Sequence, residues 1–139
     1  MAECDDGWYS YETIAVLWGT MNSQLIYHIA KRSRWEETEP SGSFRNNSLD
    51  AEGFIHCSTL EQVLRVADAH FRGQHGLVLL EIRSAQVRSE IRYEGLPGGE
   101  LFPHIYGPLN TDAVTRAVAF EPCEDGRFKL PPELAAGRR

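Results

Sequence analysis

The decisive stretch of this sequence is residues 53–71, GFIHCSTLEQVLRVADAHF, because its pattern changes midway from that of a strand to that of a helix. In the first part, Phe54, His56 and Ser58 fall on one face of an extended chain, and the residues between them fall on the other. We therefore predict a strand over residues 53–57. It places a histidine beside hydroxyl side chains where the strand meets the following helix.

The second part of the stretch is predicted to be a helix, because its apolar residues recur at helical spacing and Gly73 is suited to end it. Thr59 can cap this helix together with Gln62; if Ser58 is the cap instead, Glu61 completes the capping box. Unpaired N–H groups at such a helix start favour an anion such as phosphate. The ordinary alternative is that the hydroxyls only cap the helix.

The remaining segments predict more strands than helices. Residues 77–82 form a nearly continuous apolar run, which indicates a central strand covered on both faces. Residues 102–109 contain two prolines, so we expect an edge strand or an extended loop there and not a central strand. The other expected elements are strands at 25–30, 87–93 and 114–120, helical turns at 31–37 and 48–52 separated by a break at 40–43, and a hairpin strand at 127–130 after the Asp125-Gly126 turn. Without a repeating βαβ order, these elements predict an α+β fold.

The length of 139 residues suits one domain with its own core. We assign residues 21–132 to that domain, 1–20 to an N-terminal extension of uncertain structure, and 133–139 to a frayed tail. The formal net charge of −6 argues against a dedicated nucleic-acid binder, which usually has a basic face. The sequence does not predict an oligomeric state.

The expected location is the cytoplasm. No apolar run approaches the roughly 20 residues of a membrane helix, and the apolar patch at 14–18 follows acidic residues and not the basic residues of a secretory signal. The cysteines at positions 4, 57 and 123 are odd in number and widely separated, which suits a reducing compartment. We interpret all three as free thiols.

Three of the five histidines, His28, His56 and His104, lie in apolar segments with strand-like patterns. Each alone is more often a hydrogen-bonded core residue than a ligand contact. An unpaired polar side chain in such a segment costs free energy, so each needs a partner or a ligand. Tyr106, two residues after His104, would share its face and supply an aromatic wall or a hydroxyl, with core packing as the alternative. The sequence therefore predicts a cleft lined by histidines.

Other chemistries have weaker support. Three histidines permit a zinc site with an open fourth position, but no two of them have the short spacing of common metal motifs, so we predict no metal. Cys57 points to the strand face opposite His56, which favours a small buried hydrophobe over a Cys–His nucleophilic pair. Glu81, Glu94 and Glu100 are candidate carboxylates, although solvated surface is the favoured reading for Glu100.

Four segments, in order, closely resemble the bacterial family called domain of unknown function 952, with the resemblance covering roughly residues 24–132. They are Ile26-Tyr27-His28-Ile29, Glu52 to Thr59 followed by Gln62-Val63, Leu79-Leu80-Glu81-Ile82, and Phe102 to Leu109. This family is grouped with the ADP-ribosyltransferase-like fold, alongside RNA 2′-phosphotransferases and diphtheria-toxin-type transferases. The resemblance therefore implies an ADP-ribosyltransferase-like fold of mixed or antiparallel strands around a cleft, with a few short helices.

The resemblance also implies roles for particular residues. In those relatives a first-strand histidine hydrogen-bonds the ribose at the nicotinamide end of NAD, and His28 is similar to it in position. His56, Ser58 and Thr59 match a second-strand motif beside the nicotinamide. A late strand of the relatives carries a catalytic glutamate that stabilises an oxocarbenium-like state. The corresponding segment here, 104–106, has no acidic residue, and histidine cannot supply the same negative charge.

The leading hypothesis is a protein that binds NAD, or a related ADP-ribose or phosphorylated nucleoside ligand, and transfers or hydrolyses it. The assigned residues are His28 for ribose positioning, His56 and His104 as general acid and base, and Ser58, Thr59 and Tyr106 as further ligand contacts. A non-catalytic ligand-binding or regulatory domain on the same scaffold is the first alternative, and a three-histidine metal-dependent hydrolase is the second.

Overall fold

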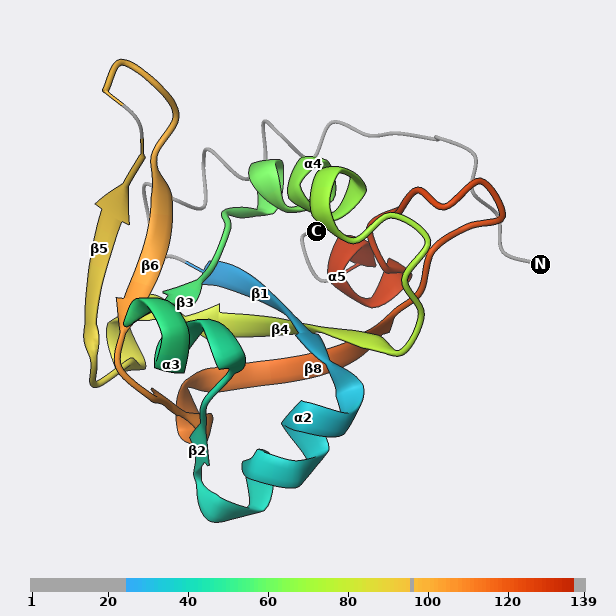
Figure 1. Ribbon diagram of the computed structural model, residues 1–139. Helices are drawn as coiled ribbons and strands as arrows, with labels where there is room; N and C mark the ends of the chain where they lie inside the picture. The colour runs from blue at the N-terminus through green and yellow to red at the C-terminus, as the bar shows by residue number, and fades with distance from the viewer. Residues whose placement is uncertain (1–24, 96, 137–139) are drawn as a thin grey trace.

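An antiparallel sheet of three strands, β1 (Leu25–Lys31), β4 (Leu77–Arg83) and β8 (Val114–Phe120), crosses the centre of the molecule (Figure 1). It belongs to a computed structural model that describes residues 25–95 and 97–136. β4 lies between the other two strands, and six of its seven residues are buried. The predicted central strand is confirmed, and strands form at 25–31 and 114–120 as predicted, whereas the strand expected at 87–93 lies at 90–94 in a different sheet.

A second antiparallel sheet has the order β3 (Ile55–His56), β6 (Phe102–Tyr106) and β5 (Glu90–Glu94). β6 is its central strand, so the prediction that residues 102–109 cannot form one was wrong. Pro103 is tolerated because the nitrogen and the carbonyl of a strand residue point to the same edge. Its carbonyl accepts from the backbone N–H of Cys57 at 3.0 Å, so its nitrogen also points toward β3. β3 pairs through only two residues, and the missing donor costs the ladder little.

Two groups of buried side chains form the core. The first joins the two sheets. It contains Ile26, Ala30, Val78, Leu80 and Ile82 from the first sheet, Ile55 and Ile105 from the second, and Cys57, which follows β3. The second covers the other face of the first sheet with side chains of helix α4 (Leu60–His70) and the C-terminal segment. The second sheet therefore buries one face against the first and leaves its other face available for a site.

Short helices and turns connect the strands. They are α2 (Arg32–Thr38), η1 (Glu39–Ser41), α3 (Asn47–Glu52), η2 (Ser84–Gln86), η3 (Thr111–Ala113) and α5 (Pro132–Ala136), with a small two-stranded sheet of β2 (Ser43–Phe44) and β7 (Leu109–Asn110). Helix α4 begins with a capping box formed by Thr59 and Gln62, which is the first of the two caps that the sequence allowed. The backbone N–H of Thr59 donates to Gln62 Oε1 at 2.9 Å.

The C-terminal region differs from the prediction. A turn lies at residues 124–126, but 127–130 are not a strand. Phe128 is nevertheless buried in the core, and its N–H donates to Asp68 Oδ1 at 2.9 Å instead of to a strand partner. Residues 132–136 form α5 and bury Leu134, so this part of the chain is not a frayed tail. The predicted extension at 1–20 and residues 137–139 lie outside the described residues.

The interpretation of three free thiols holds for Cys57 and fails for Cys123, which is disulfide-bonded, while Cys4 lies outside the described residues. Because disulfides persist mainly in oxidising compartments, the argument from cysteine usage for a cytoplasmic location loses its support. In the described part of the chain, no helix has the length and apolar composition needed to cross a membrane.

Candidate functional site

The open face of the second sheet gathers polar and aromatic side chains from all three strands. The register places His56 of β3 opposite His104 of β6, and His104 opposite Arg92 of β5. Side chains alternate along a strand, so Ile55 and Ile105 point to the buried face while these three share the other one. Residues from positions 52 to 106 are thereby brought into one cluster.

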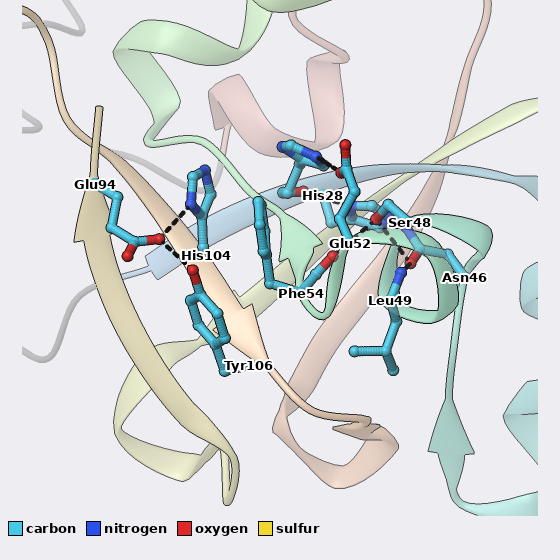
Figure 2. A network of polar contacts seen from close by, with 10 residues as sticks. His28, Asn46, Ser48, Leu49, Glu52, Phe54, Glu94, His104 and Tyr106 are labelled. Atoms are coloured by element: carbon cyan, nitrogen blue, oxygen red, sulfur yellow. Dashed lines mark hydrogen bonds and ion pairs between the residues drawn. The ribbon is translucent and has the colours of Figure 1, made fainter. Parts of the chain in front are cut away.

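Glu94 of β5 connects two of the predicted site residues. Its Oε1 lies 2.9 Å from His104 Nδ1 and accepts from the Tyr106 hydroxyl at 2.6 Å (Figure 2). These hydrogen bonds, that of Tyr106 first, lower the pKa of Glu94, and the carboxylate raises the pKa of Tyr106. Glu94 is therefore ionised at neutral pH. A neutral His104 that donates from Nδ1 presents Nε2 as a proton acceptor.

His56 has its own carboxylate partner. Its Nε2 lies 2.6 Å from Glu52 Oε1, and both side chains are about half exposed, at 54% and 51%. Glu52 is the last residue of α3, and Gly53 turns the chain toward β3 with a φ of 89°, a conformation that glycine adopts without strain. The predicted strand at 53–57 is accordingly shorter, because Gly53 ends the preceding helix.

Aromatic rings fill the space between the two histidines. Phe54 stacks on His104 with ring centroids 4.3 Å apart, and its ring also lies 4.7 Å from that of His56 and 5.1 Å from that of Tyr106. The guanidinium of Arg92 lies 4.2 Å from the centre of the Tyr106 ring. The rings of the two histidines are 5.2 Å apart. These contacts join the rings of Phe54, His56, His104 and Tyr106 into one aromatic cluster on this face.

His28 is placed behind this face and not on it. The residue is only 5% exposed. Its Nδ1 lies 2.6 Å from the backbone oxygen of His56, and its Nε2 lies 3.3 Å from Asn46 Nδ2. Burial lowers its pKa to about 4, so the ring is neutral at physiological pH. Because protein groups engage both nitrogens, a ribose hydroxyl would have to displace one of them.

The two hydroxyl residues are also held by the protein. Ser58 is buried, and its backbone exchanges hydrogen bonds of 2.7 and 2.8 Å with Tyr27 of β1. Thr59 is occupied in the capping box of α4. Of the six predicted site residues, the structure therefore brings His56, His104 and Tyr106 together, whereas the other three make separate contacts.

The family described as Protein of unknown function (DUF952) matches residues 29–117, which is more than half of the chain. The chain belongs to this family. The X-ray crystal structure of protein CC0527 from Caulobacter crescentus is 38% identical, with a TM-score of 0.72 over 80% of this chain and 98% of that one. The solution NMR structure of the same protein is 37% identical, with a TM-score of 0.68 over 81% and 97%. No curated protein matches the chain.

In this DUF952 protein, several site residues were missed by the sequence analysis. Glu52, Phe54 and Arg92 were not assigned to the site, and Glu94 was named only as one of three candidate carboxylates. A signal existed in the alternation of Glu90, Arg92 and Glu94, which places all three on one face of a strand. The register of that strand against β6 could not be inferred from the pattern.

The three histidines of the DUF952 chain do not converge as a metal site would require. The His28 ring is turned toward Asn46 and the backbone of His56. Among residues 25–95 and 97–136, no group of three or more His, Cys, Asp or Glu side chains is placed to hold a metal ion. The metal-dependent alternative therefore gains no support from the geometry.

Proposed function

We propose that this protein binds NAD, or a related ADP-ribose or phosphorylated nucleoside, on the open face of the second sheet and cleaves the bond between the ribose and its ring. The observation that carries this proposal is the Glu94 carboxylate beside His104 and Tyr106. The segment around His104 lacks an acidic residue of its own, and Glu94 supplies one from the neighbouring strand. The ADP-ribosyltransferase-like fold implied by the sequence resemblance supports the same class of ligand.

A carboxylate is the group that this cleavage needs. When the ribose C1′–N bond breaks, its electron pair leaves with the nicotinamide ring and a positive charge develops on the ribose. A fixed negative charge at that point stabilises the transition state. Two donors hold the pKa of Glu94 below its usual range, so the negative charge persists at neutral pH.

The charge of the whole face favours a cationic ring over an anionic one. Glu52, Glu90 and Glu94 lie on it together with Arg92, whose charge is paired with Glu90 at 3.1 Å. The nicotinamide ring of NAD is positively charged before cleavage, and aromatic rings such as that of Phe54 attract a cationic group. The nicotinamide end of the ligand is the part that suits these side chains.

His56 is suited to activate the acceptor. When Nε2–H donates to Glu52, Nδ1 is free of a proton and can take one from water or another acceptor as it attacks the ribose. The imidazolium that forms is stabilised by the Glu52 carboxylate, as in other carboxylate–histidine pairs. With water as the acceptor, the products are ADP-ribose, nicotinamide and one proton.

The test combines binding with turnover. Calorimetric titrations should show NAD binding more tightly than ADP-ribose, because only NAD carries the cationic ring, and nicotinamide release should accompany binding. Glu94→Gln should reduce the rate of release by about 100-fold, the scale expected for a lost stabilising group. Glu90→Gln, a change on the same strand and face, is the matched control and should have a much smaller effect.

The outcomes separate the alternatives. Binding of NAD without nicotinamide release would favour the non-catalytic ligand-binding domain. If neither NAD nor ADP-ribose binds, the nucleotide proposal is wrong. If Glu94→Gln and Glu90→Gln lower the rate of nicotinamide release equally, Glu94 is not the carboxylate that stabilises the transition state.

A further inference from the structure

Hydrogen bonds join His28 to the backbone of His56 and, through Asn46, to the start of α3, the helix that ends at Glu52. One end is direct: His28 Nδ1 lies 2.6 Å from the backbone oxygen of His56. A carbonyl can only accept, so Nδ1 carries the ring proton and Nε2 of the neutral ring is an acceptor. The contact of Nδ1 thus fixes the tautomer of His28, and it requires Nε2 to be the acceptor in the second contact.

The other end runs through Asn46. Because Nε2 of His28 accepts, it is the Asn46 amide nitrogen that donates to it, at 3.3 Å, and Oδ1 of Asn46 is left to accept. Oδ1 receives the backbone N–H of Leu49 at 3.0 Å, which makes Asn46 the N-cap of α3. α3 ends at Glu52, the carboxylate that contacts His56.

The surroundings hold the His28 ring in this orientation. The residue is 5% exposed, and its ring packs against Phe44 in an edge-type contact with centroids 5.6 Å apart. Phe44 is itself fully buried. The imidazole is thus a rigid spacer between the strand that carries His56 and the cap of the helix that carries Glu52.

We infer that His28 is a positioning residue that holds His56 through its backbone carbonyl and Glu52 through Asn46 and helix α3. Its importance for catalysis rests on the proposed function, in which His56 is the general base. The effect of His28 on the geometry of the Glu52–His56 pair is independent of the proposed function, because that geometry can be measured without any ligand.

The experiment uses Asn46→Ser in the full chain. Serine is as good an N-cap as asparagine, so this change keeps the cap of α3 but removes the contact with His28. Asn47→Ser, at the next and exposed position, is the matched control. His28→Asn is a second variant, which keeps a donor near the position of Nδ1 and loses the acceptor.

The first readout is the tautomer of His56 in nitrogen-15 spectra of the histidine rings at about pH 9, where an ordinary histidine is neutral. The wild type and Asn47→Ser should show the single Nε2–H tautomer that donates to Glu52. Asn46→Ser and His28→Asn should show a mixture. If Asn46→Ser folds and retains the single tautomer, or if the wild type is already a mixture, the positioning role is wrong.

The second readout is nicotinamide release. Asn46→Ser should lower kcat by about tenfold with little change in KM, which indicates the loss of a contribution specific to the transition state. It should have almost no further effect when Glu52→Gln is already present, because both changes act through the same pair. Additive losses would contradict the inference. A wild type without turnover would refute the proposed function alone, since the spectra would still decide the positioning role.

Discussion

The Tyr106 hydroxyl lies 2.6 Å from Glu94 Oε1, the same oxygen that faces His104 Nδ1 at 2.9 Å. In the register of β5 and β6, Glu94 is paired with Phe102, so both donors reach it from further along β6. One carboxylate oxygen thus holds two side chains of the neighbouring strand, and each donor helps to keep it ionised.

Removing the hydroxyl should therefore change the acidity of Glu94. In Tyr106→Phe the carboxylate loses its strongest hydrogen bond, its pKa rises, and the acidic limb of the pH profile for nicotinamide release moves to higher pH. We expect kcat/KM at neutral pH to fall by about tenfold, the scale of a hydrogen bond to a charged group. Tyr93→Phe is the matched control, since Tyr93 lies on the same hairpin with its side chain on the opposite face. An unshifted acidic limb in Tyr106→Phe would contradict the role of the hydroxyl.

His28 should make the stability of the protein depend on pH. Its pKa is 6.5 when unfolded and about 4 when folded, so between these values the unfolded state binds a proton that the folded state does not. The stability that the neutral His28 gives the folded state is fully present above pH 6.5. As the pH falls from 6.5 toward 4, the free energy of unfolding decreases by about 3 kcal/mol in total. Urea unfolding of the wild type and of His28→Asn across this range measures it. The variant should lose stability less steeply; parallel curves would show that His28 does not titrate as expected.

Cys57 should be chemically inert in the folded protein. Burial raises the pKa of its thiol well above the usual range, and the thiolate is the reactive form. Alkylation followed by peptide mass spectrometry should leave Cys57 unmodified in the native protein and modify it in urea. Cys57→Ala should keep nicotinamide release within a few-fold of the wild type, because the proposed chemistry uses no thiol. Rapid labelling of the native protein would reopen the Cys–His reading.

Thr59 should contribute to stability and not to ligand binding. Thr59→Ala removes the cap of α4 and should lower the free energy of unfolding by about 1 kcal/mol. Thr59→Ser keeps the capping oxygen and should restore most of that stability. Calorimetry should find the same affinity for NAD in both variants. A tenfold weaker affinity in Thr59→Ala alone would instead assign the hydroxyl to a phosphate contact.

Local patterns predicted those parts of the fold that are decided by burial. The aliphatic run at 77–82 became the central strand β4, the alternation at 114–120 became β8, and the cap at Thr59 with its helical spacing became α4. Each of these signals lies within a dozen residues of sequence. The order of the strands has no such local signal. Pro103 therefore led to the wrong prediction that residues 102–109 cannot form a central strand.

The site was predicted less completely than the fold, for a related reason. His56 and His104 were identified because their segments are locally unusual, but their carboxylate partners depend on how chain segments meet. Glu94 reaches His104 only through the pairing of β5 with β6, and Glu52 reaches His56 only because Gly53 reverses the chain. His28 had the same apolar setting as the other two, and only the tertiary structure separates a buried support from an exposed site residue.

The site is built from two segments of chain that the register of the second sheet brings together. Glu52 and His56 lie on one continuous piece of chain, Glu94, His104 and Tyr106 lie on another, and the pairing of His56 with His104 joins them. The end of the turn between Glu94 and Phe102 is tied to helix α4, because Glu100 accepts hydrogen bonds from Gln62 and Arg65. A single residue inserted between His104 and Tyr106 would place these two side chains on opposite faces of the sheet. In evolution and in protein engineering, such a hairpin would constrain Gly95, which has no room for a side chain beside the Glu100 backbone, and the alternation of residues 102–106.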